Sequence, residues 1–136
     1  MFESYTEKLH LPKLIEKRAR HIVTENYRVL QAVNVLKGND LKAFGQLMNA
    51  SHESLRDDYE VTGKELDALF SIQKEVEGCI GTRMTGAGFG GCTVSLVERD
   101  QIDSFKEKVT RGYQTQTGLE PLFYVSEAGD GVSELK

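Results

Sequence analysis

Four glycines lie within six positions of the stretch RMTGAGFGGCTVSLV, which covers residues 83–97. Gly86, Gly88, Gly90 and Gly91 allow the backbone to adopt positive φ and to present consecutive N–H groups to an anion such as phosphate. The alternative is a tight turn between two strands, although a single glycine pair would be enough for that. The stretch therefore favours a loop close to phosphate, and the plain turn remains open.

Three well-known phosphate-binding loops can be tested against these glycines. Gly86, Gly88 and Gly91 satisfy the pattern G-x-G-x-x-G, but a dinucleotide-binding fold needs a helix directly after the loop. Here the β-branched run 92–97 follows instead. A P-loop needs Gly-Lys-Ser/Thr, which is absent. The chain also contains nothing similar to the catalytic motifs that accompany a protein-kinase glycine loop. None of the three loops explains the stretch.

Charged side chains near the loop and in the middle of the chain are the next candidates. Arg83 stands directly before the loop, where a cation could meet phosphate, but strand alternation could equally turn it to the far face to pair with an acid. Asp57 and Asp58, beside Arg56, could form a metal or acid–base pair. Adjacent carboxylates in a turn are more often solvated or paired with arginine, and we expect that here.

The histidines and cysteines do not suggest a metal centre or a reactive thiol. His10, His21 and His52 are far apart in the sequence and have no partners at ligand spacing, so no zinc site is predicted. Cys79 and Cys92 lie in apolar stretches and are expected to be free thiols, which fits a reducing compartment. For Cys92, a buried small thiol is the expected role.

The first half of the chain must position these groups through helices. Apolar residues at spacings of three and four predict a helix from Leu14 that ends at Gly38-Asn39-Asp40, with Asp40 capping the next helix. A polar break at 56–59 ends the second helix. Thr62 and Glu65 have the spacing of a capping box at the start of a third helix, which Gly78 closes.

The second half changes to strands. We predict strands at 80–85, 92–97 and 122–125, and a helix capped by Asp100 that ends near Gly118. The fold class is therefore α+β, with helices covering one face of a largely antiparallel sheet.

Length and composition indicate one soluble domain of 136 residues, helical over 13–78, sheet-forming over 79–126 and ending in a polar tail at 127–136. The net charge of −4 argues against a nucleic-acid partner. No apolar stretch is long enough to span a membrane, and the first residues have no signal-peptide character. We expect a cytoplasmic protein that binds neither nucleic acid nor membrane.

Several segments together resemble one family. GTRMTGAGFGGCTVSLV at 81–97 looks like the third conserved motif of the GHMP kinase superfamily, in the form typical of galactokinases. Four further segments are similar to galactokinase segments in the same order: KRARHIVTEN at 17–26, FGQLMNASHESLRDDYEVT at 44–62, ELDAL at 65–69 and FYVSEAGDG at 123–131. The resemblance covers nearly all of the chain beyond the first dozen residues.

The resemblance implies an enzyme of two domains, with the active site between them. Galactokinases transfer the γ-phosphoryl group of ATP to the anomeric hydroxyl of α-D-galactose, assisted by Mg²⁺. Their C-terminal domain is ferredoxin-like, a four-stranded antiparallel sheet packed with helices. Carried over residue by residue, the positions at the cleft are Thr85, Gly86, Ala87, Gly88, Phe89, Gly90 and Gly91, and Arg83 is added as a candidate for its place before the loop.

The chain departs from the family by what it lacks. The phosphate loop Pro-x-x-x-Gly-Leu-Ser-Ser-Ser is absent, since Pro12 and Pro121 are the only prolines. The sugar-binding signature and the catalytic aspartate and arginine are also missing. We therefore expect the chain to be inactive alone, with no catalytic residue and no metal ligand of its own. Its expected partner is the N-terminal galactokinase domain, and galactose and ATP bind in the complete enzyme. The alternative is a non-catalytic regulatory or ligand-sensing module.

Overall fold

The computed structural model describes residues 11–131. The elements in chain order are α2 (Lys13–Lys37), α3 (Leu41–Ser54), the π-helical turn η1 (Leu55–Tyr59), α4 (Lys64–Gln73), β1 (Cys79–Thr85), β2 (Cys92–Val97), the 3₁₀ turn η2 (Arg99–Gln101) and α5 (Ile102–Thr117). None of the helices in this part of the chain is long and apolar enough to cross a membrane.

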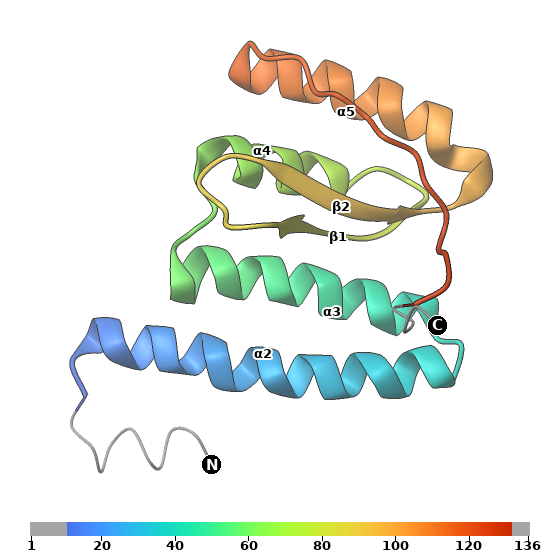
Figure 1. The fold of residues 1–136 in the computed structure, drawn as a ribbon. Helices are drawn as coiled ribbons and strands as arrows, with labels where there is room; N and C mark the ends of the chain where they lie inside the picture. The colour runs from blue at the N-terminus through green and yellow to red at the C-terminus, as the bar shows by residue number, and fades with distance from the viewer. Residues whose placement is uncertain (1–10, 132–136) are drawn as a thin grey trace, which may run out of the picture.

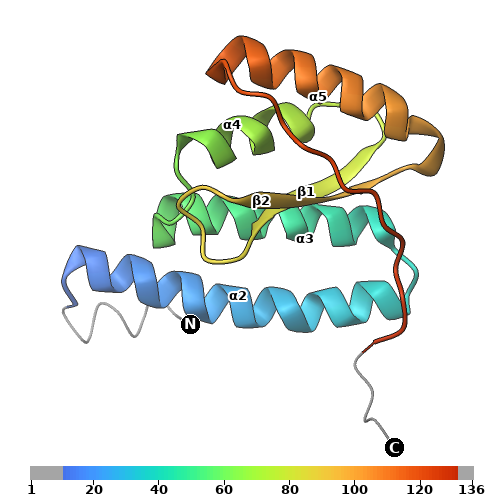
Figure 2. The same ribbon diagram turned by 45° about the horizontal axis from the view of Figure 1, so that its top comes forward.

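The elements form layers around a small antiparallel sheet (Figures 1 and 2). α3 runs along the outer edge of β1 and lies against one face at Gly81, with α2 outside it, whereas α4 lies on the other face with α5 beyond. The α+β class is confirmed, but the expectation that helices cover only one face is wrong. β1 buries both of its faces: Gly81 lies against Gly45 of α3, whereas Met84 packs with Leu66 of α4. A strand buried on both sides needs a layer on each.

The predicted third strand is not formed. Within the described residues the sheet consists of β1 and β2 alone. Residues 122–125 belong instead to a segment without strand pairing (Figure 1). We call this segment, residues 119–126, the strap. Only Phe123 packs into the core there, against Val76, Phe105 and Val109. The strap and β2 both line a cleft of about 720 Å³. A third strand would pair with β2 through backbone hydrogen bonds. Within the described residues the strap makes no such pairing, and a cleft lies between it and β2.

Some predicted helix ends are confirmed. The Oδ1 atom of Asp40 accepts a hydrogen bond from the Ala43 N–H at 2.9 Å, so Asp40 caps α3 as expected. α5 ends at Gly118, whose φ of 74° is the left-handed conformation that glycine adopts readily. α4, however, ends at Gln73, before Gly78. The predicted polar break at 56–59 is instead η1, which continues α3 by a π-helical turn.

Two predicted N-caps are wrong. Thr62 does not cap α4, because it is 2% exposed and turned into the core, and Gly63 occupies the cap position. No side-chain hydrogen bond caps this helix, so the capping box with Glu65 is not formed. Asp100 lies inside η2, and Gln101 precedes α5 instead. In both cases the N-cap is a residue that the sequence pattern did not predict: Gly63 for α4 and Gln101 for α5.

Candidate functional site

The glycine loop, residues 85–91, joins β1 to β2 at one end of the sheet. Its backbone has positive φ at five positions: Gly86, Gly88, Phe89, Gly90 and Gly91. An added Cβ at Gly86, Gly90 or Gly91 would meet open space. The loop therefore exposes its backbone at these glycines, with room for a ligand to approach.

One contact anchors the loop to the helical half of the chain. The Phe89 N–H donates to the carbonyl oxygen of Val61 at 2.7 Å. Gly88 lies so close to the same carbonyl that a Cβ would overlap the oxygen. Glycine at 88 is thus required by packing as well as by its φ of 84°. Val61 belongs to the connection between η1 and α4, so this connection fixes the position of the loop.

His52 holds the residue that enters the loop. Its ring is fully buried, stacked on Phe70 with centroids 3.9 Å apart. Its Nδ1 accepts the Met84 N–H at 3.0 Å, which leaves Nε2 to donate to Asp67 Oδ1 at 3.3 Å. Burial lowers the pKa of His52 below its ordinary value, although Asp67 acts in the opposite direction. The neutral ring is the form that can accept from Met84.

His52 is a site residue that the sequence analysis weighed only as a metal ligand. Asn49, one helical turn earlier on α3, accepts the Thr82 N–H at 2.9 Å. Together Asn49 and His52 satisfy two N–H groups of β1, at Thr82 and Met84, that β2 does not. The spacing of two hydrogen-bonding side chains at i and i+3 on one helix face was the available signal.

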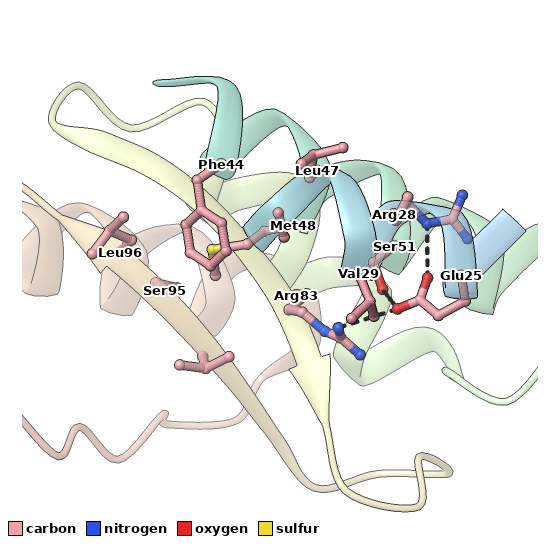
Figure 3. Close-up of a pocket in the computed structure, with 12 residues that line it drawn as sticks. Glu25, Arg28, Val29, Phe44, Leu47, Met48, Ser51, Arg83, Ser95 and Leu96 are labelled. Atoms are coloured by element: carbon pink, nitrogen blue, oxygen red, sulfur yellow. Dashed lines mark hydrogen bonds and ion pairs between the residues drawn. The ribbon is translucent and has the colours of Figure 1, made fainter. Parts of the chain in front are cut away.

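Arg83 points to the face of the sheet that carries α2 and α3 (Figure 3). Its Nη1 lies 3.3 Å from Glu25 Oε1, and Glu25 also accepts from Ser51 Oγ at 2.6 Å and from Arg28 Nε at 2.7 Å. Burial raises the pKa of Glu25, but the hydrogen bonds from Ser51 and Arg28 outweigh it and lower the pKa below its ordinary value. The geometry shows the acid pairing of Arg83, and its contact with phosphate stays a prediction.

Two hollows flank the sheet on different sides. One, of about 310 Å³, lies between α2, α3 and β2, with Phe44 and Met48 at its apolar part and the Arg83 ion pair at its polar part (Figure 3). The larger cleft, of about 720 Å³, is lined by Gly91 and Cys92 at the end of the glycine loop and continues between β2, α5 and the strap. The glycine loop thus stands at the larger cleft.

The acidic pair in η1 is engaged with neighbouring side chains. Arg56 donates to both carboxylate oxygens of Asp57, at 2.7 and 2.9 Å. The hydrogen bond from Arg56 lowers the pKa of Asp57. Asp58 Oδ2 accepts from Ser54 Oγ at 3.4 Å. The expected pairing with arginine is confirmed for Asp57.

No group of three His, Cys, Asp or Glu side chains suited to a metal ion is found between residues 11 and 131. His21 contacts Ser54 Oγ through Nδ1 at 2.9 Å, and His52 is paired as described above. His10 lies outside the described residues.

The two cysteines differ. Burial raises the pKa of Cys79 to about 11, as befits a thiol inside the domain. Cys92 is exposed, so the expectation of a buried thiol is wrong. It is the first residue of β2 and lines the cleft beside the glycine loop.

Comparison with known proteins agrees with this architecture. The family model "GHMP kinases C terminal" matches residues 30–115. Galactokinase from Halalkalibacterium halodurans is 59% identical over 124 residues, and galactokinase from Fusobacterium nucleatum is 58% identical over 120 residues. These matches cover 91% and 88% of this chain, but 31% of each relative.

A solved structure shares the fold. The crystal structure of Lactococcus lactis galactokinase complexed with galactose matches with a TM-score of 0.90 and 45% sequence identity, over 96% of this chain and 33% of the solved one. The chain thus spans about a third of the length of the relatives it matches. By its family match and its fold, the chain belongs to the GHMP kinase family, as the C-terminal domain found in galactokinases.

Proposed function

We propose that this chain serves as the C-terminal part of an enzyme that phosphorylates α-D-galactose with ATP to give galactose 1-phosphate. The observation that carries the proposal is the agreement in fold over 96% of this chain with a galactokinase solved in complex with galactose. Sequence identities of 58 to 59% with two galactokinases support it. In this proposal the chain forms one domain and works in the cytoplasm.

The glycine loop is proposed to line the nucleotide side of the active-site cleft, which forms between this domain and the N-terminal galactokinase domain. ATP supplies the phosphoryl group, and Mg²⁺ assists. This chain contributes the exposed backbone of residues 86–91 and the hydroxyl of Thr85, which is also exposed. The fit rests on the positive φ values and on the open space above Gly86, Gly90 and Gly91. Backbone donors held in place before phosphate arrives stabilise negative charge without reorganising.

The anchors of the loop provide that fixed position. Val61 holds Phe89 from one side, and His52 holds Met84 from the other. Arg83 adds a positive charge behind the loop, partly neutralised by Glu25. Phosphoryl transfer depends chiefly on positioning and charge stabilisation. The residues that bind sugar, hold Mg²⁺ and accept the proton are proposed to come from the N-terminal galactokinase domain, so the chain alone is expected to be inactive.

A chimera tests this proposal. The matching third of the Halalkalibacterium halodurans galactokinase is replaced by this chain, and ADP release is measured with and without galactose. We expect galactose-dependent activity within about tenfold of the parent enzyme, because 59% identity preserves the core and the loop. The isolated chain should release no ADP under the same conditions.

A charge in the loop then tests its role. Gly90→Glu places a carboxylate in open space beside the proposed phosphate site and should reduce kcat/KM for ATP by about 100-fold or more through repulsion. Gly90→Gln is the matched control: it brings the same backbone strain at φ 97° without the charge, so its activity should fall much less than that of Gly90→Glu. A folded chimera that does not respond to galactose would refute the enzymatic role and favour a regulatory or ligand-sensing module.

A further inference from the structure

The amphipathic pattern of α2 is turned the opposite way from that of an ordinary surface helix. Between Ile22 and Leu36, every exposed residue is uncharged, whereas the two charged residues of this stretch, Glu25 and Arg28, are turned inward. We define the α2 outer face by its large apolar side chains, each 46 to 64% exposed: Ile22, Val23, Tyr27, Leu30, Val33 and Leu36. A helix normally directs such residues toward the core.

The inner face of α2 is attached to the rest of the domain largely by polar contacts. His21 meets Ser54, and Glu25 receives the hydroxyl of Ser51 at 2.6 Å. His21 is the only buried residue of α2 in the described structure. The α2 outer face therefore contributes little to the core of this domain, and its apolar side chains are open to contact with another surface. α2 is the outermost layer on this side of the domain (Figures 1 and 2).

We infer that the remaining part of a galactokinase chain packs on the α2 outer face. This inference rests on the proposed function and adds the surface through which the two parts meet. The solved Lactococcus lactis galactokinase is matched over only 33% of its length, so the larger part of such a chain is available to cover the helix. An uncharged, apolar face fits the interior of a single folded chain or an obligate interface.

A second copy of this chain is a poorer occupant. A helix of 25 residues is about 37 Å long and about 10 Å wide, so one face presents roughly 400 Å². A stable dimer buries about 800 Å² on each partner. Pairing α2 with its own copy would cover too little, whereas a larger folded unit can extend from α2 onto neighbouring surfaces.

Reconstitution from two pieces tests the inference. The part of the Halalkalibacterium halodurans galactokinase that this chain does not match is produced separately and mixed with this chain, and complex formation is followed by sedimentation velocity. We expect a one-to-one complex. The double variant Ile22→Glu/Leu30→Glu should weaken it by about 100-fold, because two carboxylates would be buried without partners. Thr115→Glu is the control, because Thr115 is exposed on α5, and α5 lies on the opposite side of the sheet from α2 (Figure 1).

The outcomes separate the two proposals. Equal binding by the wild type and the double variant, with circular dichroism showing both folded, would overturn the inference. So would self-association of this chain through the same residues without binding of the second piece. Hydrogen exchange gives an independent readout, since α2 amides should gain protection in the wild-type complex. A complex that depends on α2 but shows no galactose-dependent ADP release would support the interface and count against the proposed function instead.

Discussion

At the scale of single residues, His52 links the helical half of the chain to the glycine loop. Its imidazole Nδ1 accepts the backbone N–H of Met84, and its Nε2 donates to Asp67 on α4. A protonated ring would carry a hydrogen on Nδ1 and could no longer accept the Met84 N–H. The position of the loop entrance is therefore coupled to the charge of one buried side chain.

The first prediction concerns pH. Burial lowers the pKa of His52 and of His21 below the ordinary 6.5, so the unfolded chain binds more protons below that pH. The free energy of unfolding should be level above pH 6.5 and fall below it, by up to about 1.4 kcal/mol per pH unit for each histidine. Denaturant unfolding between pH 5 and 8 measures this.

His52→Gln is the informative variant, because its amide can accept from Met84 and donate to Asp67 but does not titrate. The slope below pH 6.5 should become shallower and keep the contribution of His21. An unchanged slope would show that His52 is not the group responsible.

The second prediction compares two glycines of the loop. Gly86 and Gly88 have nearly the same φ, 83° and 84°, but only at Gly88 would a Cβ overlap the Val61 oxygen. Gly86→Ala should cost about 1 kcal/mol from backbone strain. Gly88→Ala should cost about 1 to 3 kcal/mol more, because the loop must move off Val61. Thermal unfolding of the two variants gives the difference, and equal costs would argue against the close approach at Gly88.

At the scale of elements, side chains of α3 form hydrogen bonds to β1 that a neighbouring strand would otherwise form. Asn49 and His52 accept N–H groups along the outer edge of β1. An unpaired edge would be a template for other strands, and α3 prevents this at two positions. β2 has no such cover: its residues line the larger cleft opposite the strap. The helix can reach β1 because Gly45 lets the two backbones approach.

The third prediction tests that approach. A Cβ at Gly45 would overlap the Ile80 carbonyl, and Gly81 faces Gly45 from the strand. Gly45→Ala should therefore lower the free energy of unfolding by about 2 to 3 kcal/mol, even though alanine is the better helix former. Gly38→Ala is the control, since its Cβ would meet only ordinary contacts and its φ is −81°. It should be neutral or slightly stabilising. Similar values for the two variants would contradict the packing of α3 on β1.

At the scale of the whole molecule, the domain has a firm part and a weakly attached outer layer. The apolar clusters lie among η1, α4, β1 and α5, with Leu66 and Val109 almost completely buried. α2 lies outside them and is held mainly by hydrogen bonds and ion pairs, such as Arg18 to Glu60 at 2.8 Å. Exposed ion pairs contribute little to stability.

The fourth prediction follows from this division. Amides of α2 should exchange with solvent through a partial opening that leaves α3 and β1 closed, with protection at least about tenfold lower than in β1. Native-state hydrogen exchange followed by mass spectrometry measures it. The length of α2, 25 residues, does not protect it, because helices in proteins gain most of their stability from packing. Equal protection across α2 and β1 would show a single cooperative unit.

The sequence alone determined the family, most of the elements and the place of the loop. These features are local, because each can be recognised from a few neighbouring residues: the helical periodicity, the caps at Asp40 and Gly118, and the glycine spacing at 86–91. Only the tertiary structure decided that Arg83 pairs with Glu25, that His52 supports Met84, that residues 122–125 stay unpaired and that the apolar stripe of α2 faces outward. These outcomes depend on which distant segments meet, and neither periodicity nor spacing encodes the identity of a non-local partner.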